Sequence, residues 1–354
     1  MVQETSTKRV CPKCGGKFDE NQSVCPTDGA ALSSPRASAP ILSGDKSVIG
    51  ERVGPYEVLL MRNTGNKSFI FEVKTDSGQR LAMKMLRPEL SQNKSSFERF
   101  QQEARLALAM DHPNTVKVHD FATSASGQPY LIMELLDGVT LAKVIGEKGR
   151  LDLKTFKSVF RQLCDVLGAA HKRGVIHRDL KPEHVMLSEQ AESNPSVKLL
   201  DFGCSKDLER QQKLTVPGLV IGNAEFMSPE QCSAGNIDAR SDVYSLACMM
   251  YYALIGTKPF TGNIVTVLQK HLSEAPPSMK QANPEASVPA SLEKSVIKAM
   301  EKDPKQRQQS VDELWRDIEN SISEEKSDAK NDSEGKPVKG KFLDGLVKHF
   351  KKTD

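Results

Sequence analysis

The sequence contains no apolar run long enough to cross a membrane. A bilayer span needs about 20 consecutive, predominantly apolar residues, and no stretch of the 354 residues comes near that length. The N-terminus also lacks an apolar run of signal-peptide length. We therefore expect a soluble chain located in the cytoplasm.

Net charge and paired cysteines are scarce as well. A formal net charge of +3 creates no global field that would attract nucleic acid or a membrane, so we expect no nucleic-acid partner. Of the seven cysteines, three cluster near the N-terminus and four are scattered singly. This distribution is typical of a metal site plus buried thiols in a reducing compartment, and it argues against a disulfide framework.

The N-terminal cysteines belong to the segment CPKCGGKFDENQSVCPTDG, residues 11–29, which holds two near-copies of a Cys-Pro-x-x-Gly turn. Cys11, Cys14 and Cys25 have zinc spacing, and Asp28 occupies the fourth ligand position, where a carboxylate can complete a tetrahedral site. The pattern resembles a zinc ribbon, a module that more often docks partners than performs chemistry. A metal-free cysteine pair or a CxxC redox motif is the alternative.

The most informative stretch is residues 177–185, His-Arg-Asp-Leu-Lys-Pro-Glu-His-Val, which lies between an apolar-periodic helix and a short strand. Phosphoryl transfer to a hydroxyl requires an acceptor for the hydroxyl proton and a cation near the migrating group. Asp179 and Lys181 fit these two roles. Asp201 follows at the end of a second apolar run, where a Gly turn begins, and it occupies a metal-ligand position.

These motifs resemble the catalytic loop HRDLKPxN and the metal-binding DFG loop of the protein kinase family. The resemblance implies an α+β fold with a small antiparallel-sheet lobe and a large helical lobe, and it implies ATP and Mg²⁺ or Mn²⁺ as cofactors. It places His184 where the family has the Asn that binds the second magnesium. A chance occurrence of the motif in an unrelated helical protein is the alternative.

The replacement of that Asn by His184 leads to a prediction about metals and pH. Magnesium prefers oxygen ligands, so an imidazole should weaken the second magnesium site and affect manganese less. The carboxylates of Asp179 and Asp201 should raise the pKa of His184 above about 6.5, and an imidazolium would repel a cation. The sequence therefore predicts activity that is low with magnesium, higher with manganese, and that rises with pH through neutrality.

Three segments, Tyr56–Met61, Ser68–Lys74 and Arg80–Leu86, have strand character and are separated by turn signals. They predict an antiparallel sheet, which the resemblance extends to five strands. The first turn corresponds to the glycine-rich flap over the ATP phosphates. The three glycine positions of this flap hold Asn63, Gly65 and Ser68. We expect a weakened flap, because only the central glycine remains.

The resemblance also assigns the other nucleotide-binding residues. Lys84 would hold the α- and β-phosphates, and Glu103, on a helix predicted for Ser95–Met110, would pair with it. An exposed position is the alternative for both side chains. Backbone groups of Glu134 and Leu136 would bind the adenine. The ATP-binding set is Gly65, Ala82, Lys84, Glu103, Glu134, Leu136 and Met186.

In the large lobe, residues 152–173 place a stripe of apolar side chains on one helical face, which predicts a core helix. The resemblance gives structural roles to three further residues. Glu230 would pair with Arg307, and Asp242, on an apolar helix that runs to Ile255, would tie down the catalytic loop. Met133 would close the pocket behind the adenine.

The resemblance also predicts how the chain is regulated. Arg178 would bind a phosphate on the activation segment, where Thr215 is the best acceptor and Ser205 the second candidate. Asn223 is a further departure from the family, because it replaces a Thr that helps to hold the catalytic Asp and Lys. Both side chains form hydrogen bonds, so positioning is only partly changed.

Composition divides the chain into five parts. These are a zinc-ribbon-like module at 1–32, a disordered linker at 33–49, the kinase-like domain at 50–321, a second disordered linker at 322–338 and a basic amphipathic helix at 339–354. The last part predicts a peripheral contact with an anionic membrane surface. Fraying at Gly340 and Gly345, or folding back onto the kinase-like domain, is the alternative.

We therefore expect a serine/threonine protein kinase that transfers the γ-phosphate of ATP to proteins, itself included. Lys181 follows the serine/threonine pattern and argues against tyrosine specificity. The alternative is a pseudokinase scaffold that acts through its terminal modules. Lys84, Glu103, Asp179 and Asp201 favour catalysis, whereas Asn63, Ser68, His184 and Asn223 favour the scaffold.

Overall fold

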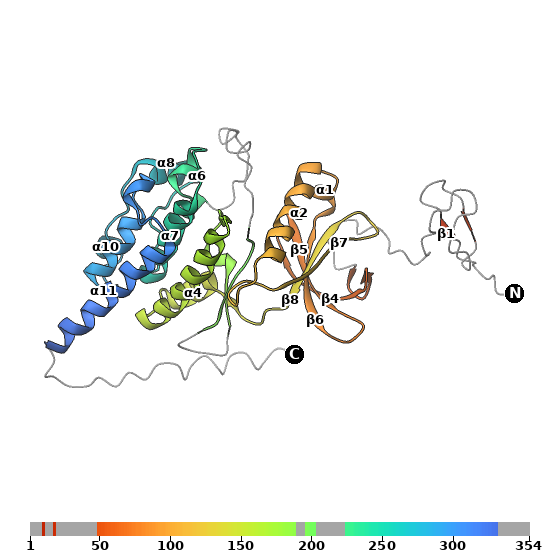
Figure 1. Cartoon of the computed structure of the whole chain (residues 1–354), viewed down its shortest axis with the longest axis horizontal. Coiled ribbons are helices and arrows are strands. Elements are labelled where there is room, and N and C mark those ends of the chain that lie inside the picture. The colour runs from red at the N-terminus through yellow and green to blue at the C-terminus, as the bar shows by residue number, and fades with distance from the viewer. Residues whose placement is uncertain (1–8, 11–16, 19–47, 189–194, 203–223, 332–354) are drawn as a thin grey trace.

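The computed structural model describes residues 9–10, 17–18, 48–188, 195–202 and 224–331. Two lobes lie side by side: a curled sheet that carries two helices, and a larger assembly of helices (Figure 1). This arrangement confirms the two-lobed α+β architecture predicted from the sequence. None of the helices in the described ranges combines the length and the hydropathy that a membrane span requires.

The small lobe is built on one antiparallel sheet with the strand order β3-β4-β5-β6-β8-β7. Its strands are β3 (Arg52–Val53), β4 (Tyr56–Thr64), β5 (Ser68–Lys74), β6 (Arg80–Leu86), β7 (Val118–Thr123) and β8 (Pro129–Glu134). The sheet has six strands, so the prediction of five is wrong. The additional strand, β3, is two residues long and pairs with the start of β4, and two residues are too few to show a period of two.

The small lobe begins before the predicted linker ends. Val48 is 2% exposed and packs in the same core cluster as Val58 and Phe71. The boundary at residue 49 is therefore wrong, because the two adjacent apolar residues Val48 and Ile49 give no periodic signal. Apolar burial, and not composition, sets this edge of the lobe.

Two helices lie against the sheet, α1 (Pro88–Ser91) and α2 (Lys94–Ala109). The Asn93 side chain caps α2 by accepting a hydrogen bond from the Ser96 amide. Phe100 and Ala104 are buried and face the sheet, which α2 contacts at β7 and β8. This packing fixes the face of α2 that carries Glu103.

The large lobe contains eight helices within the described ranges. They are α3 (Leu141–Lys148), α4 (Leu153–Lys172), α6 (Pro229–Cys232), α7 (Ala239–Ile255), α8 (Ile264–Ser273), α9 (Met279–Ala282), α10 (Ala290–Ala299) and α11 (Val311–Asn331). Three single turns of 3₁₀ helix accompany them, η2 (Pro182–His184), η3 (Ala224–Phe226) and η4 (Pro304–Gln306). A small sheet joins β9 (Val139–Thr140), β10 (Val185–Leu187) and β11 (Val197–Leu199).

The core of the large lobe surrounds α7, which is buried along almost its whole length. The predicted stripe of α4 packs against it through side chains such as Phe156, Phe160 and Leu163. A helix buried on all sides needs no polar face, which explains the unbroken apolar run from Leu246 to Ile255 in the C-terminal part of α7. The catalytic stretch, residues 177–185, follows α4 and is hydrogen-bonded to Asp242 of α7.

The last helix, α11, ends ten residues after the predicted domain boundary at 321 and enters the segment 322–338 that we expected to be disordered. Ile318 and Ile322 are buried in the large-lobe core. Their i,i+4 spacing continues the apolar face of the helix, although the composition around them is already that of a linker. The start of the predicted linker is therefore wrong.

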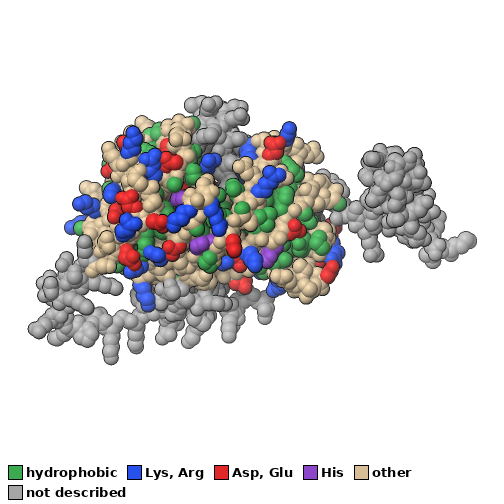
Figure 2. All heavy atoms as spheres, in the orientation of Figure 1, with side chains coloured by type: hydrophobic (Ala, Val, Ile, Leu, Met, Phe, Trp, Pro, Cys, Tyr) green, Lys and Arg blue, Asp and Glu red, His purple; other side chains and the backbone are tan. Residues whose placement is uncertain are grey.

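On the face that Figure 2 shows, Lys and Arg side chains are interspersed with Asp and Glu over both lobes. The described side chains of this face present no extended area of one sign. This distribution agrees with the nearly balanced formal charge of +3. On this face the electrostatic effects of the charged side chains are therefore local.

Candidate active site

The backbone of residues 177 and 178 is fixed by a buried carboxylate on α7. The two oxygens of Asp242 accept hydrogen bonds from the His177 amide at 2.8 Å and from the Arg178 amide at 3.0 Å. Burial alone would raise the pKa of Asp242, but the hydrogen bonds from His171 and His177 hold it below its ordinary value. The predicted role of Asp242 is confirmed.

Arg178 and Asp201 both adopt left-handed backbone conformations, with φ of 66° and 57°. A side chain other than glycine occupies this region only where its surroundings enforce it. The Arg178 amide donates to Asp242, and its carbonyl accepts from Gln231 Nε2 at 2.6 Å. These bonds present Asp179, the next residue, to the space between the lobes.

Asp179 lies beside Lys181 and His184, the two side chains that the sequence predicted near it. Lys181 Nζ is 3.4 Å from Asp179 Oδ2, and His184 Nδ1 is 3.7 Å from the same oxygen. The Asp179 side chain is 12% exposed. A largely buried carboxylate with an ammonium at this distance suits the acceptance of a hydroxyl proton beside a migrating anion.

Lys84 connects the two lobes through two carboxylates. Its Nζ is 2.5 Å from Glu103 Oε1 on α2 and 2.6 Å from Asp201 Oδ1 in the large lobe. Burial raises the pKa of Glu103 despite the nearby ammonium. For Asp201 burial acts in the same direction, but Lys84 and His184 outweigh it and lower the pKa to about 2. The predicted pairing of Lys84 with Glu103 is confirmed.

His184 lies between Asp179 and Asp201. Its Nδ1 is 2.9 Å from the backbone carbonyl oxygen of Asp179, and its Nε2 is 3.5 Å from Asp201 Oδ2. Burial lowers the pKa of His184 to about 4 and outweighs the two carboxylates, which act to raise it. The predicted rise of this pKa is wrong because desolvation of the ring dominates. His184 is neutral at pH 7, so it gives no reason for activity to rise with pH through neutrality.

The flap over the cleft is the hairpin that joins β4 to β5. Asn63 and Gly65 are exposed, and the Gly65 amide donates to the Ser68 carbonyl at 2.9 Å. Arg87, which precedes α1, donates to the carbonyl of Gly65 at 2.8 Å and to the hydroxyl of Thr64 at 3.0 Å. The flap therefore has an anchor that the sequence did not reveal.

Residues 63–317 match the family profile of the protein kinase domain, well over half of the chain. The chain belongs to the protein kinase family. One curated relative, the serine/threonine-protein kinase PknB of Mycobacterium tuberculosis, is 38% identical over 245 residues, which cover 67% of this chain and 38% of PknB. Another, the serine/threonine-protein kinase Pkn1 of Myxococcus xanthus, is 32% identical over 318 residues, which cover 88% of this chain and 45% of Pkn1.

The chain thus spans less than half the length of these two relatives. Among solved structures, the kinase domain of PknI from Mycobacterium tuberculosis superimposes with a TM-score of 0.61 over 79% of this chain and 100% of that domain, at 22% identity. This likeness establishes the fold of a protein kinase. The resemblance found in the sequence motifs is confirmed at the level of family and fold.

The residues predicted to surround the adenine lie on β6, β8 and β10 and in the segment that follows β8. Ala82 is buried on β6 and pairs with Met133 of β8. Met186 lies on β10 opposite Thr140. Leu136 follows β8 in the segment between the lobes and is half-buried. The predicted adenine residues therefore all lie on elements that border the junction of the two lobes.

Glu134 has a role that the sequence did not indicate. Its Oε1 accepts hydrogen bonds from the Lys117 amide at 2.7 Å and from Lys198 Nζ at 2.7 Å. Lys198 is on β11 of the large lobe and also donates to the Thr115 carbonyl at 3.1 Å. The Glu134 side chain therefore fixes the segment between the lobes, while its backbone remains at the predicted adenine edge.

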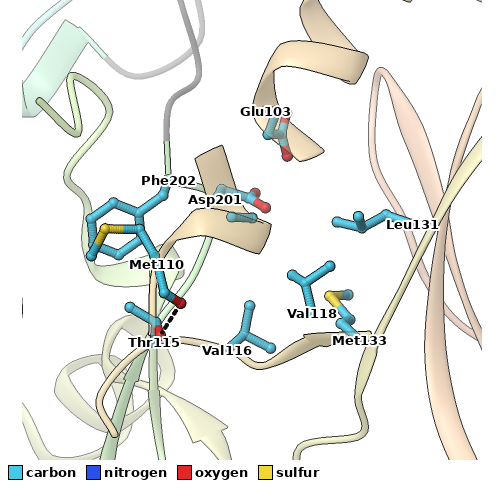
Figure 3. A pocket seen from close by; sticks show the side chains of 10 residues that line it. Glu103, Met110, Thr115, Val116, Val118, Leu131, Met133, Asp201 and Phe202 are labelled. Atoms are coloured by element: carbon cyan, nitrogen blue, oxygen red, sulfur yellow. Dashed lines mark hydrogen bonds between the residues drawn. The ribbon is translucent and has the colours of Figure 1, made fainter. Parts of the chain in front are cut away.

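An apolar pocket lies behind Met133, next to Glu103 and Asp201, as Figure 3 shows. It is lined by Glu103, Ala107, Met110, Thr115, Val116, Val118, Leu131, Met133, Asp201 and Phe202. Thr115 Oγ1 lies 2.9 Å from the His112 carbonyl oxygen and 3.5 Å from that of Met110, so the His112 carbonyl is its main acceptor. Met133 is one of the lining residues, and its predicted role of closing the pocket behind the adenine stays a prediction.

Several predicted site residues lie outside the described part of the chain. They are the zinc candidates Cys11, Cys14, Cys25 and Asp28, the phosphate acceptors Thr215 and Ser205, and the departure Asn223. The strands β1 (Arg9–Val10) and β2 (Lys17–Phe18) are described and pair antiparallel, with Arg9 opposite Phe18. The roles assigned to the undescribed residues stay predictions.

The donor set between the lobes fits a divalent cation and a nucleotide. Asp201 offers carboxylate oxygen and His184 offers imidazole nitrogen, whereas Lys84 offers an ammonium for phosphate. The described residues contain no cluster of three or more His, Cys, Asp or Glu side chains that could hold a metal without help. A cation here would share its coordination between the protein and the nucleotide phosphates, and it would neutralise their charge.

Proposed function

We propose that the chain is a serine/threonine protein kinase that transfers the γ-phosphate of ATP to protein hydroxyls, its own included. The observation that carries the proposal is Lys84 held at 2.5 Å from Glu103 and at 2.6 Å from Asp201. In this role Lys84 binds the α- and β-phosphates and Asp201 binds the metal. Asp179 orients the substrate hydroxyl and accepts its proton, and Lys181 stabilises the charge of the transferring group.

The choice of serine and threonine over tyrosine rests on two observations. Lys181 follows the catalytic Asp by two positions and lies 3.4 Å from it, the arrangement of the serine/threonine pattern. The relatives PknB and Pkn1 both carry the name serine/threonine-protein kinase. Both observations support a protein hydroxyl of the aliphatic class as the acceptor.

The scaffold alternative requires a site that has lost its catalytic contacts. In this chain the contacts of Lys84, Glu103, Asp179 and Asp201 are all present. Asn63 is exposed in the flap, where its side chain accepts a hydrogen bond from the Thr64 amide. The departures at Asn63, Ser68 and His184 leave these contacts in place, so we favour catalysis over the scaffold.

The test is a transfer assay on the purified full chain with γ-³²P-ATP, a generic basic protein substrate, and magnesium or manganese. We expect label on the chain and on the substrate, and acid hydrolysis should release phosphoserine or phosphothreonine. Phosphotyrosine alone would contradict the specificity. Complete absence of label with both metals would favour the scaffold.

We also propose that phosphate on the activation segment regulates the enzyme, with Thr215 as its acceptor and Arg178 as its binding partner. The backbone of Arg178 is held on both sides by Asp242 and Gln231. A guanidinium on so rigid a base provides a fixed anchor for a phosphate. Ser205 is the second acceptor candidate.

For the N-terminal module we propose a structural zinc site made by Cys11, Cys14, Cys25 and Asp28. The antiparallel pairing of β1 with β2 supports it, because these strands flank the segment that holds Cys11 and Cys14. We expect one zinc per chain by elemental analysis, and loss of that zinc without loss of the folded kinase domain when residues 1–32 are deleted. Zinc that persists after the deletion would contradict the assignment.

For the tail we propose that residues 339–354 attach a cytoplasmic chain to an anionic membrane surface. Lysines opposite an apolar arc support this role. We expect the full chain to sediment with vesicles that contain phosphatidylserine, less so as salt screens the lysines, and not after the tail is removed. Equal sedimentation with and without the tail would leave only the alternative in which the tail folds onto the kinase.

A further inference from the structure

The hydrogen bonds of His184 define which of its ring nitrogens carries the proton. Nδ1 is 2.9 Å from the backbone carbonyl oxygen of Asp179, and a carbonyl oxygen can only accept a hydrogen bond. Nδ1 is therefore the donor, and in the neutral ring Nε2 has the lone pair. This is the form of histidine that binds metal ions.

The ring is also held in one orientation. The His184 carbonyl accepts a hydrogen bond from the Leu200 amide at 2.8 Å, and the His184 amide donates to the Lys181 carbonyl at 3.0 Å. The side chain is 12% exposed. With the backbone fixed on both sides and Nδ1 bonded to Asp179, Nε2 remains directed toward Asp201.

Asp201 divides its two oxygens between different neighbours. Oδ1 is 2.6 Å from Lys84 Nζ, whereas Oδ2 is 3.5 Å from His184 Nε2. A separation of 3.5 Å is close to that of two ligands bound to one cation at about 2.0–2.2 Å each. Nitrogen and oxygen thus face the same small space, on the side of Asp201 away from Lys84.

We propose that His184 Nε2 and Asp201 Oδ2 form a mixed nitrogen and oxygen site that selects a first-row transition-metal cation over magnesium. The inference deepens the proposed function and rests on it, because nucleotide phosphates complete the coordination. Magnesium prefers oxygen ligands and resists dehydration. Nitrogen ligands favour the transition metals, and they bind cobalt more tightly than manganese. An Asn in place of His184 would offer oxygen and lose that preference.

The test is a direct measurement of metal binding that does not require turnover. Calorimetric titrations with Mg²⁺, Mn²⁺ and Co²⁺ in the presence of ADP should compare the wild type with His184→Asn. The matched control is His119→Asn, whose side chain is exposed on β7. For the wild type and the control we expect affinities that rise from magnesium to manganese to cobalt. In His184→Asn the ratio of manganese to magnesium affinity should fall by about tenfold or more.

A spectroscopic measurement on the wild type tests the same metal site even if the His184→Asn variant does not fold. Electron spin echo spectroscopy of bound Mn²⁺ should show a directly bound imidazole nitrogen, and ¹⁵N-histidine labelling should change that signal. The proposed metal site would be overturned if the ¹⁵N-labelled and unlabelled proteins gave the same spectrum. It would also be overturned if wild type and His184→Asn had the same ratio of manganese to magnesium affinity. If the chain transfers no phosphate yet shows the nitrogen signal, the proposed function fails and the metal site stands.

Discussion

An Asp179→Asn variant should transfer phosphate roughly 10²–10⁴-fold more slowly than the wild type, the loss expected when a positioned proton acceptor is removed. Asn has the same shape and keeps the hydrogen-bonding geometry, but it cannot accept the hydroxyl proton. The Asp179 side chain is 12% exposed, so bulk water cannot readily replace it. The measurement is the initial rate of ³²P incorporation at saturating ATP.

Two controls separate this result from a loss of structure. Asp76→Asn makes the same chemical change on a surface turn, at a side chain that is 77% exposed, and should leave the rate unchanged. The melting temperature of Asp179→Asn should stay within a few degrees of the wild type. A rate for Asp179→Asn equal to that of Asp76→Asn would remove Asp179 from the mechanism.

An Arg307→Met variant should lose about 3–5 kcal/mol of unfolding free energy, because it leaves a buried carboxylate without its partner. Arg307 donates to both oxygens of Glu230, at 2.8 and 2.9 Å, and its side chain is 0% exposed. The same guanidinium donates to the carbonyls of Glu301 and Lys302. The measurement is urea unfolding of both proteins at neutral pH.

The matched control is Arg240→Met, which breaks a partly exposed pair with Asp238 and should cost less than about 1 kcal/mol. The difference between wild type and Arg307→Met should also shrink in acid. Although burial acts to raise it, Arg307 and Ser241 hold the pKa of Glu230 below its ordinary value. The pair therefore stabilises the protein above the unfolded pKa, and this contribution is lost as pH falls through the lowered one. Equal losses of unfolding free energy in Arg240→Met and Arg307→Met would contradict a stabilising role for the buried pair of Arg307 and Glu230.

The contacts that the sequence predicted correctly join residues of ordered motifs. Lys84 with Glu103, Glu230 with Arg307, and Asp242 with the catalytic loop all connect side chains that the family resemblance names together, and the structure contains all three. A buried charge requires a partner. Once one member of such a pair is recognised, the choice of its partner is therefore narrow.

The contacts that the sequence missed depend on surroundings that no motif encodes. Arg87 reaches the flap, and Glu134 reaches Lys198, because distant segments pack together. The pKa of His184 is lowered because the ring is desolvated. The charged residues of a motif do not reveal how deeply one of its side chains is buried, so the sequence could not predict this shift. The predicted domain boundaries at residues 49 and 321 were wrong for the same reason, because the burial of Val48 and Ile322 is not visible in the composition around them.

The double contact of Lys84 has a consequence for how the kinase can be switched. In a kinase whose helix α2 swings outward, only a fraction of the molecules can bind nucleotide, and the apparent affinity is reduced by that fraction. In this structure α2 is docked, with Glu103 joined through Lys84 to Asp201. A signal that moved α2 outward would have to break the ion pair between Lys84 and Glu103, so the position of this helix and the placement of the phosphate-binding lysine are coupled.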